Sequence, residues 1–527
     1  MLLLSVIVSL PILGEVSESS TGLVNLFNME KHSIRLHADS SFASSRRLHT
    51  AGVGEEISHQ QTSRDALIPM VLGLLAIAML SIVTYATRSD KYIPESSCAL
   101  LVGVVAGAIL KSLDHSYYAP IFKFNSSIFF LGMLPPLMFW GGFKVDKTAF
   151  FSEICTILVY AIIGVSLTIA FVGPLLFVSS VGGYTLYESL MYASLISATD
   201  PVCALAILEK QGIEPRLFTI LFGEALLNDA IALVFYNLFV EFIEQGYSMQ
   251  KICAMIGLGV LNSWGACMLG IFIALLGTVL MKFTTCAGYP PLQVLIVLVV
   301  CEMSFFIADA LYMSGIISSF CAGIFIAMYA RPNFTFQGHQ LTDNFFDILI
   351  RILELATFFV LGTTLVFNGF HWNMPLCLTI FGLCFAGRII VIVGLSVPIN
   401  VGLHAQAARV SFKEQIMFCW VGIRGAIAFS AVNDLPMEAQ KKDDLIGATE
   451  FMLLAGIFVF GTSTFPMMKY LHIRCGLKGG EAGEYPQIEH PRWKILLRTH
   501  IHQNVLCQKL LKAYPPEQLQ EGDFALV

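Results

Sequence analysis

The sequence predicts an all-α protein that crosses a membrane about thirteen times. The first observation behind this is composition: of 527 residues, 56% are hydrophobic and only 13% are charged, whereas soluble domains carry about 25% charged residues. The second is the recurrence of long apolar runs from about residue 66 onward. The third is that two of these runs are interrupted by proline or glycine together with a charged residue. A soluble domain could not bury this much apolar surface.

The predicted spans follow one another with short polar loops between them. They lie at 67–87, 96–111, 126–143, 154–178, 187–208, 217–240, 252–280, 291–311, 313–330, 350–368, 375–399, 413–432 and 449–470. Loops on the cytosolic side of a membrane are enriched in Lys and Arg. In this chain the basic residues gather in alternate loops: Arg88 and Lys91, Lys144 and Lys147, Lys210 and Arg216, Lys282, Arg331, and Arg409 and Lys413. We therefore expect an N-terminus outside, a C-terminus in the cytosol and an odd number of helices.

The two ends of the chain differ from this membrane domain, which we place at 66–471. Residues 1–14 hold a short apolar stretch that reads either as a signal peptide or as an uncleaved extra helix. Residues 15–65 are polar and are expected to be extracytosolic or lumenal. Residues 472–527 form a short cytosolic tail, whose basic, partly amphipathic stretch 492–514 is suited to the anionic inner leaflet or to a partner helix.

The remaining composition argues against several other roles. The net charge of −6 gives no reason to expect a nucleic-acid partner. The 13 cysteines contain no Cys-x-x-Cys pair, and we expect them to be small buried hydrophobic residues rather than metal ligands. No cofactor is expected.

Two predicted spans are interrupted in their middle. The span at 187–208 contains Thr199, Asp200 and Pro201, and a proline removes a backbone donor and opens the helix one turn before it. The span at 413–432 contains Arg424 within the sequence GIRG, where the glycines allow the backbone to leave helical geometry. The two spans are seven segments apart, as expected for two six-helix inverted repeats joined by a linker helix. Interrupted helices at matching positions of two halves indicate the substrate site of a transporter.

The span at 217–240 carries the polar residues Glu224, Asn228 and Asp229. Glu224 and Asn228 share one helix face, whereas Asp229 lies about 100° further round. Carboxylates at membrane depth are costly and mark an ion or proton path unless they are paired. This geometry indicates one acid that is paired structurally and one that titrates. The predicted intramembrane ionisable residues are Asp200, Glu224, Asp229, Glu302, Asp309, Glu354, Arg388 and Arg424.

Six sequence stretches resemble one known family. These are MLPPLMFWGGF, ISATDPVCALAILEK, GEALLNDAIALVFYNLF, SGIISSFCAGIFIAMY, FFVLGTTL and WVGIRGAIAFS. Together they resemble, in order and spacing over roughly 67–470, the sodium/proton exchangers of the cation/proton antiporter superfamily, of the electroneutral Asn-Asp type. The resemblance implies a secondary active transporter that exchanges Na⁺ and/or K⁺ for H⁺ by alternating access and regulates cytosolic or organellar pH and cation content.

The resemblance also implies roles for particular residues. Asp229 would be the carboxylate that binds cation and proton, with Asn228 as its neutral neighbour. Thr199 and Asp200 would complete or shape this site. Ala225 stands where the family usually has Ser, which removes a hard oxygen ligand and leaves the preference between Na⁺ and K⁺ open.

Four further residues match charged positions of the family. Glu224 would form a structural ion pair with Arg388, in agreement with the need to neutralise a buried charge. Arg424 matches the arginine of the second broken helix, and Asp309 matches an acidic position tied to cation access.

We therefore expect a homodimeric, multi-pass protein of the plasma membrane or of an endosomal or vacuolar membrane, embedded in the lipid bilayer and without enzymatic activity. Two alternatives remain open at this stage. A cation channel would also carry intramembrane acids, although no filter-like segment is present. An intramembrane aspartyl hydrolase needs two aspartates on neighbouring helices, and Asp200 with Asp229 would satisfy that need.

Overall fold

A computed structural model describes most of the membrane domain. The described residues are 95–122, 124–179, 181–199, 208, 212–245, 249–283, 289–369, 372–402, 409–422, 425–433 and 435–473. Every regular element within these ranges is a helix. The N-terminal stretch, the span at 67–87, the C-terminal tail, Asp200 and Arg424 lie outside the described residues, so the expectations for them stay predictions.

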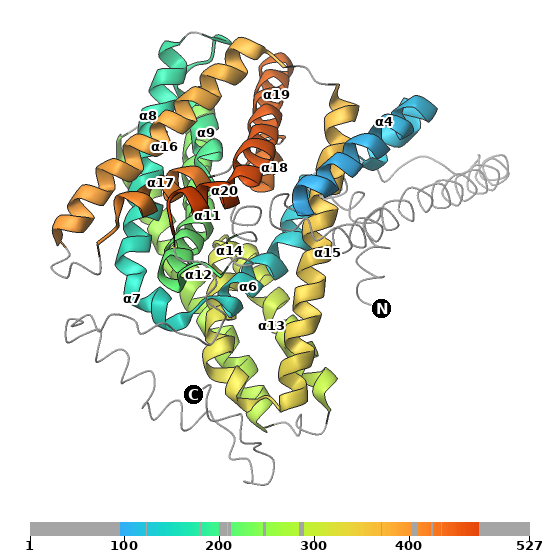
Figure 1. The fold of residues 1–527 in the computed structure, drawn as a ribbon, viewed down its shortest axis with the longest axis vertical. Coiled ribbons are helices and arrows are strands. Elements are labelled where there is room, and N and C mark those ends of the chain that lie inside the picture. Colours follow the sequence, from blue (N-terminus) through green and yellow to red (C-terminus); the bar gives the residue numbers. More distant parts are fainter. Residues whose placement is uncertain are drawn as a thin grey trace, which may run out of the picture.

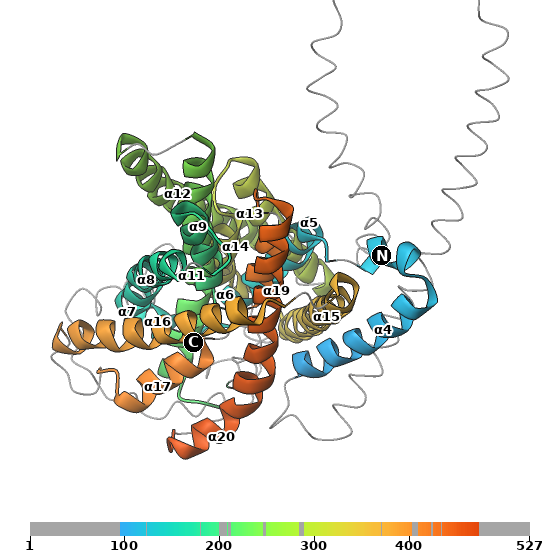
Figure 2. The ribbon, with the colours of Figure 1, turned by 90° about the horizontal axis from the view of Figure 1, so that it is seen from above.

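By their mutual contacts the helices form two groups, called bundles here, whose arrangement can be followed in Figures 1 and 2. The first bundle contains α4 (Glu95–Phe122), α5 (Ser126–Ile128), α6 (Leu134–Lys144), α12 (Met249–Phe283), α13 (Pro290–Ala310), α14 (Gly315–Phe325) and α15 (Phe336–Asn368). The second contains α7 (Lys147–Leu158), α8 (Val165–Val178), α9 (Leu186–Ser197), α11 (Pro215–Gln245), α16 (Met374–Gly402), α17 (Phe412–Val421), α18 (Ala426–Val432), α19 (Ala439–Ala455) and α20 (Thr462–Tyr470). Contacts within each bundle are extensive, and those between the bundles are sparse.

Several of these helices continue through a wider, π-helical turn. The turns lie at Phe129–Met133, Val159–Gly164, Ile326–Ala330 and Gly456–Gly461. They join α5 to α6, α7 to α8 and α19 to α20 into longer spans, and they extend α14. Such turns are rare in helices and often accompany functional sites.

The all-α, multi-span architecture predicted from the sequence is confirmed. Within the described part of the chain, ten helices are long and apolar enough to cross a bilayer, and up to eleven if the bent pair α17–α18 forms one span. The exact number of thirteen stays a prediction. Three predicted starts were too late: α7 begins at Lys147 rather than at 154, α15 at Phe336 rather than at 350, and α19 at Ala439 rather than at 449. Charged residues early in these helices, such as Glu153, Asp343 and Lys441, lowered the local hydropathy and hid these starts.

Matching caps begin the two helices that precede the predicted interruptions. At the start of α9, Thr185 and Glu188 form a reciprocal capping box, and Ser411 and Glu414 form another at the start of α17. Each satisfies backbone N–H groups that the first helical turn leaves without an intrahelical partner. Both half-helices therefore begin at positions that local side chains define.

The interruptions themselves fall close to the positions expected. Described α9 ends at Ser197, which is the residue whose carbonyl would need the N–H that Pro201 lacks. In the other span, α17 ends at Val421, α18 begins at Ala426, and the two are bent by 43°. The predicted break in this second span is present.

Ion pairs join helix ends that were predicted to share one side of the membrane. Lys144 lies 3.2 Å from Asp347, and Arg331 lies 3.1 Å from Asp343, all at ends predicted to face the cytosol. At the opposite predicted face, Lys441 of α19 pairs with Glu188 of α9 at 3.3 Å. Each pair joins ends that the loop charges place on the same side of the membrane.

Backbones of the first bundle touch where α6 crosses α14. A Cβ added at Gly142 would lie 2.2 Å from the carbonyl oxygen of Phe320, and one added at Gly323 would lie 2.1 Å from that of Phe139. No side chain fits at either position. This contact explains one glycine in each of two family-like stretches, MLPPLMFWGGF and SGIISSFCAGIFIAMY, by packing rather than by ion chemistry.

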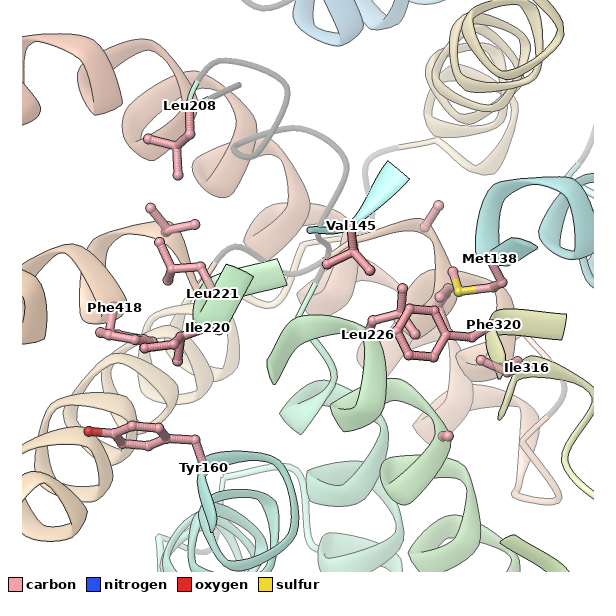
Figure 3. Close-up of a cluster of buried hydrophobic side chains, with 14 of the residues drawn as sticks. Met138, Val145, Tyr160, Leu208, Ile220, Leu221, Leu226, Ile316, Phe320 and Phe418 are labelled. Carbon is pink, nitrogen blue, oxygen red and sulfur yellow. The ribbon is translucent and has the colours of Figure 1, made fainter. Parts of the chain in front are cut away.

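Apolar side chains fix α11 between its neighbours (Figure 3). On one side, Ile220 and Leu221 lie near Phe418 of α17. On the other, Leu226 lies near Phe320 of the first bundle. α11 is thus one of the helices of the second bundle that face the first, and it carries the polar residues singled out in the sequence.

Candidate ion-binding site

The three polar residues of α11 are all buried. Glu224 is 2% exposed, and Asn228 and Asp229 are each 1% exposed. Because α11 is one continuous helix from Pro215 to Gln245, these side chains leave it in fixed directions. Two carboxylates therefore enter the interior of the second bundle from one helix, and they meet different surroundings.

Asp229 borders a small cavity between the two interrupted helices. Ala198 and Thr199 line it where α9 has ended, and Gly425, Ile427 and Ala428 line it where α18 begins. The cavity holds about 10 Å³, which is close to the space that one water molecule needs. Both helix interruptions therefore open onto the same carboxylate.

Asn228 connects α11 to the end of α9. Its Nδ2 donates a hydrogen bond to Thr199 Oγ1 at 3.0 Å, and both side chains are buried. Among the described residues, Asn228 Oδ1 is buried and accepts no hydrogen bond. A buried carbonyl oxygen in this condition is costly, and such atoms call for an explanation such as a bound water or ion. The carboxylate of Asp229, the Thr199 hydroxyl and Asn228 Oδ1 are hard oxygen donors, which suit a small monovalent cation.

Glu224 takes part in a separate, closed network. Arg388 of α16 donates from Nη1 and Nη2 to its two carboxylate oxygens at 2.6 and 2.8 Å. The same guanidinium donates from Nε and Nη2 to the carbonyl oxygen of Phe418, at 3.3 and 3.2 Å. Phe418 lies in the last turn of α17, where a cation stabilises the helix carbonyls. Arg388 therefore ties α11, α16 and the first half of the broken helix together.

Gly422 leaves room for this arginine. A Cβ at residue 422 would lie 2.7 Å from Arg388 Nε. Gly422 directly follows α17, so the helix must end without a side chain at this point. The glycine predicted to loosen the backbone thus has a second, steric reason to be present.

The structure brings some of the sequence-predicted residues together and not others. Thr199 and Asp229 line the cavity, Asn228 donates a hydrogen bond to Thr199, and Glu224 pairs with Arg388. Asp309 lies exposed in the last turn of α13, in the first bundle, whereas Asp229 lies in the second. The resemblance placed Asp200 in the ion site and matched Arg424 to the arginine of the second broken helix, and both lie outside the described residues.

Sequence reasoning missed a charged cluster at the predicted cytosolic end. Arg216 of α11 donates from Nε to Glu153 of α7 at 3.0 Å, and its Nη1 lies 3.9 Å from Glu414 of α17. Thr156 donates to the second oxygen of Glu153 at 3.1 Å. Because Glu153 and Arg216 sat just outside the predicted spans, neither entered the list of intramembrane charges. Their opposite signs at the predicted cytosolic ends of the spans at 154–178 and 217–240 were the available signal.

A second missed residue is Glu450, which is 1% exposed inside α19. The late predicted start of that helix placed it at a membrane edge. Its carboxylate accepts hydrogen bonds from Asn368 and Trp372, where the chain passes from α15 to α16.

The architecture, with many membrane-spanning helices in two bundles and buried charges in the second, defines a membrane transport protein. A family model described as the transmembrane sodium/hydrogen exchanger matches residues 74–470 of the 527. The chain belongs to the sodium/hydrogen exchanger family. Members of this family are transporters and not enzymes, so the hydrolase alternative is wrong.

Individual relatives agree with this assignment. The chain is 26% identical over 458 residues to an uncharacterized Na⁺/H⁺ antiporter of Schizosaccharomyces pombe, covering 84% of this chain and 80% of the relative. It is 28% identical over 395 residues to the Na⁺/H⁺ exchanger beta of Oncorhynchus mykiss, covering 73% of this chain. The chain spans only about half of that relative's length, 51%.

A solved structure shares the fold. The sodium proton antiporter MjNhaP1 of Methanocaldococcus jannaschii, determined at pH 8, matches with a TM-score of 0.59 at 16% identity. The match covers 77% of this chain and 99% of that protein.

Proposed function

We propose that this protein is an electroneutral antiporter that exchanges Na⁺ and/or K⁺ for H⁺ across a membrane. The observation that carries the proposal is the position of Asp229, a buried carboxylate at a small cavity where both interrupted helices end. Membership of the sodium/hydrogen exchanger family supports the coarser statement that a cation is exchanged for a proton. The names of the two relatives and of the solved structure support the same exchange.

The stoichiometry follows from the chemistry of one carboxylate. Asp229 is neutralised equally by one proton or by one monovalent cation, so only one of them occupies it at a time. If Asp229 carries a cation in one direction and a proton in the other, one cation moves for each proton and no net charge crosses the membrane. Glu224 adds no titrating charge to this count, because the guanidinium of Arg388 compensates it within hydrogen-bonding distance.

The ligand set around Asp229 would come from α11 and from the segment that follows α9. Thr199 Oγ1 from the end of α9 and Asn228 Oδ1 from α11 would join the carboxylate, with Asp200 as a further ligand. Arg424 would supply positive charge in the second interruption, and Asp309 would act at the cation entrance. Each of these roles is part of the proposal.

Alternating access would use the division into two bundles. Extensive packing within each bundle and sparse packing between them allow one to move against the other as a rigid body. Since α11 faces the first bundle and carries Asp229, such a movement would expose the carboxylate to one side of the membrane and then to the other. We place the first bundle at the interface of a homodimer, in the plasma membrane or in an endosomal or vacuolar membrane, where the exchanger would regulate pH and cation content.

Reconstitution tests the proposal directly. Proteoliposomes with an imposed pH gradient should lose it on addition of Na⁺ or K⁺, with saturation and without current; Li⁺ serves as a third cation. Asp229→Asn should abolish this exchange, because the amide cannot carry a proton or balance a cation. Asp443→Asn provides the matched control, since it makes the same substitution at an exposed position of α19. Full exchange by Asp229→Asn, or a current that follows the cation flux, would contradict the proposal.

A further inference from the structure

The chain passes from the first bundle to the second between α15 and α16. α15 ends at Asn368, and Gly369 caps it with a φ of 85°, in the left-handed region that favours glycine. α16 begins at Met374, only a few residues later. This short crossing is one of the places where a movement of one bundle against the other must be absorbed.

A buried carboxylate holds the residues on both sides of this crossing. Asn368 Nδ2 donates to Glu450 Oε1 at 3.1 Å, and Trp372 Nε1 donates to Glu450 Oε2 at 3.4 Å. Glu450 is 1% exposed and belongs to α19 of the second bundle. The Trp372 ring also packs edge-on against Phe451, at 5.9 Å between ring centroids. Each carboxylate oxygen thus binds a different end of the crossing.

The chemistry of this contact suits a role in positioning the two bundles better than a contribution to the stability of the fold. Burying a carboxylate is unfavourable, and an apolar residue of similar volume often stabilises a fold as well or better. Asn368 and Trp372 are neutral donors, so their bonds direct the carboxylate without contributing a positive charge that would offset its burial. The bond to Asn368 crosses between bundles, and so does a bond from Ser126 Oγ to the Ser430 carbonyl at 3.1 Å, at the same predicted face. Polar contacts of this kind hold only in particular relative positions of the two bundles.

We propose that Glu450 is a positioning residue for ion exchange: with Asn368 and Trp372 it forms a clamp on the crossing, which favours the arrangement of the bundles seen in this structure. The clamp, made of these three residues, must open or deform when the second bundle moves, because α15 and α19 belong to different bundles. This inference rests on the proposed function and adds a regulatory contact outside the ion site.

Loss of the clamp should change the cation affinities on the two sides of the membrane in opposite directions, which loss of a contact that only stabilises the fold would not do. A bond that stabilises one of two arrangements shifts their populations when it is removed. The apparent cation affinity should therefore rise when the cation is offered from one side of the membrane and fall when it is offered from the other. Loss of one charge-assisted hydrogen bond should change the ratio of the two apparent affinities by about tenfold.

The experiment measures exchange in vesicles of both orientations, with Na⁺ or K⁺ varied on one side at a time. Glu450→Leu and Asn368→Ala should each produce opposite shifts on the two sides, and the double variant should add nothing further, because both remove the same contact. Trp372→Phe keeps the ring against Phe451 but removes the N–H, so it should produce a smaller shift in the same direction. Glu450→Gln provides a second variant of conserved size should Glu450→Leu not fold.

Glu188→Gln is the matched control. It weakens the pair with Lys441 at the same predicted face but within the second bundle, and glutamine preserves the capping box. It should leave both affinities unchanged. Wild-type affinities in the clamp variants would overturn the inference, and so would equal losses on both sides that follow the amount of folded protein. If the unsubstituted protein shows no exchange at all, the proposed function fails and the clamp with it.

Discussion

Arg388 and Glu224 form a two-pronged pair, with Nη1 and Nη2 at 2.6 and 2.8 Å from the two carboxylate oxygens. The same guanidinium reaches the Phe418 carbonyl at the end of α17. The arginine therefore neutralises a buried acid and holds one half of the broken helix in place. One turn away, Asp229 borders the cavity. Two acids of one helix are thus divided between structure and, as proposed, transport.

Breaking this pair should cost more than removing it whole. Glu224→Ala and Arg388→Ala each leave one buried charge without its partner, which typically destabilises by about 3–5 kcal/mol. Glu224→Leu combined with Arg388→Met removes both charges and should destabilise less than the sum of the single changes. Thermal unfolding of the purified protein in detergent measures this. Additive losses in the double variant would show that the two residues do not act as a pair.

Gly422→Ala should disturb the same network without removing any charge. The new Cβ would lie 2.7 Å from Arg388 Nε, so the guanidinium must shift away from Glu224 or from Phe418. We expect slower exchange and a lower melting temperature, because the free energy of unfolding should fall by about 1–3 kcal/mol. Gly394→Ala, in α16, is the control because nothing lies within 4 Å of its added Cβ. Equal behaviour of the two variants would argue against the steric role of Gly422.

The first bundle offers a parallel test. Gly142→Ala would place a Cβ 2.2 Å from the Phe320 carbonyl oxygen, so α6 and α14 must separate. The expected loss of stability is at least about 1–3 kcal/mol, measured by thermal unfolding. Gly132→Ala has open space around its Cβ and should be neutral or stabilising. A Gly142→Ala variant as stable as the starting protein would show that this helix crossing can relax.

Ala225→Ser tests the origin of ion preference. Residue 225 lies one turn before Asp229 on the same face of α11 and is buried, so a hydroxyl there would add a hard oxygen near the carboxylate. We expect the apparent affinity for Na⁺ to rise relative to K⁺ by about fivefold, corresponding to about 1 kcal/mol for one added interaction. Competition between the two cations in proteoliposomes measures the ratio. Ala230→Ser, on another face of α11, is the control, and an equal change in both variants would count against the prediction.

Much of this architecture could be predicted from residue patterns. Apolar runs predicted the spans, alternating loop charges predicted ends that the ion pairs bring together, and the Gly422–Gly425 segment predicted a break that is present. The Glu224–Arg388 contact was implied by the resemblance to the exchanger family, in agreement with the need of a buried acid for a cation. The other features depend on local sequence or on loop charge.

Other features depend on tertiary packing. Nothing in the sequence near Phe418 marks its carbonyl as an arginine acceptor, because any backbone offers the same group. Glu450 was overlooked because the charged residues at 441–444 made the helix seem to start later than Ala439. A hydropathy window averages charged and apolar residues together, whereas the actual start of a helix also depends on the neighbouring helices that pack against it. The transport roles of Asp229, Asn228 and Thr199 stay predictions.

The size of the space beside Asp229 bears on how fast ions can be loaded. About 10 Å³ accommodates roughly a single water molecule, so an alkali ion would have to arrive almost stripped of its hydration shell. The oxygens of Asp229, Thr199 and Asn228 would have to replace those waters at nearly the same energy, or the dehydration would slow every turnover. The turnover rate of such an exchanger would be limited by how closely these protein oxygens match the energy of the ion's hydration shell.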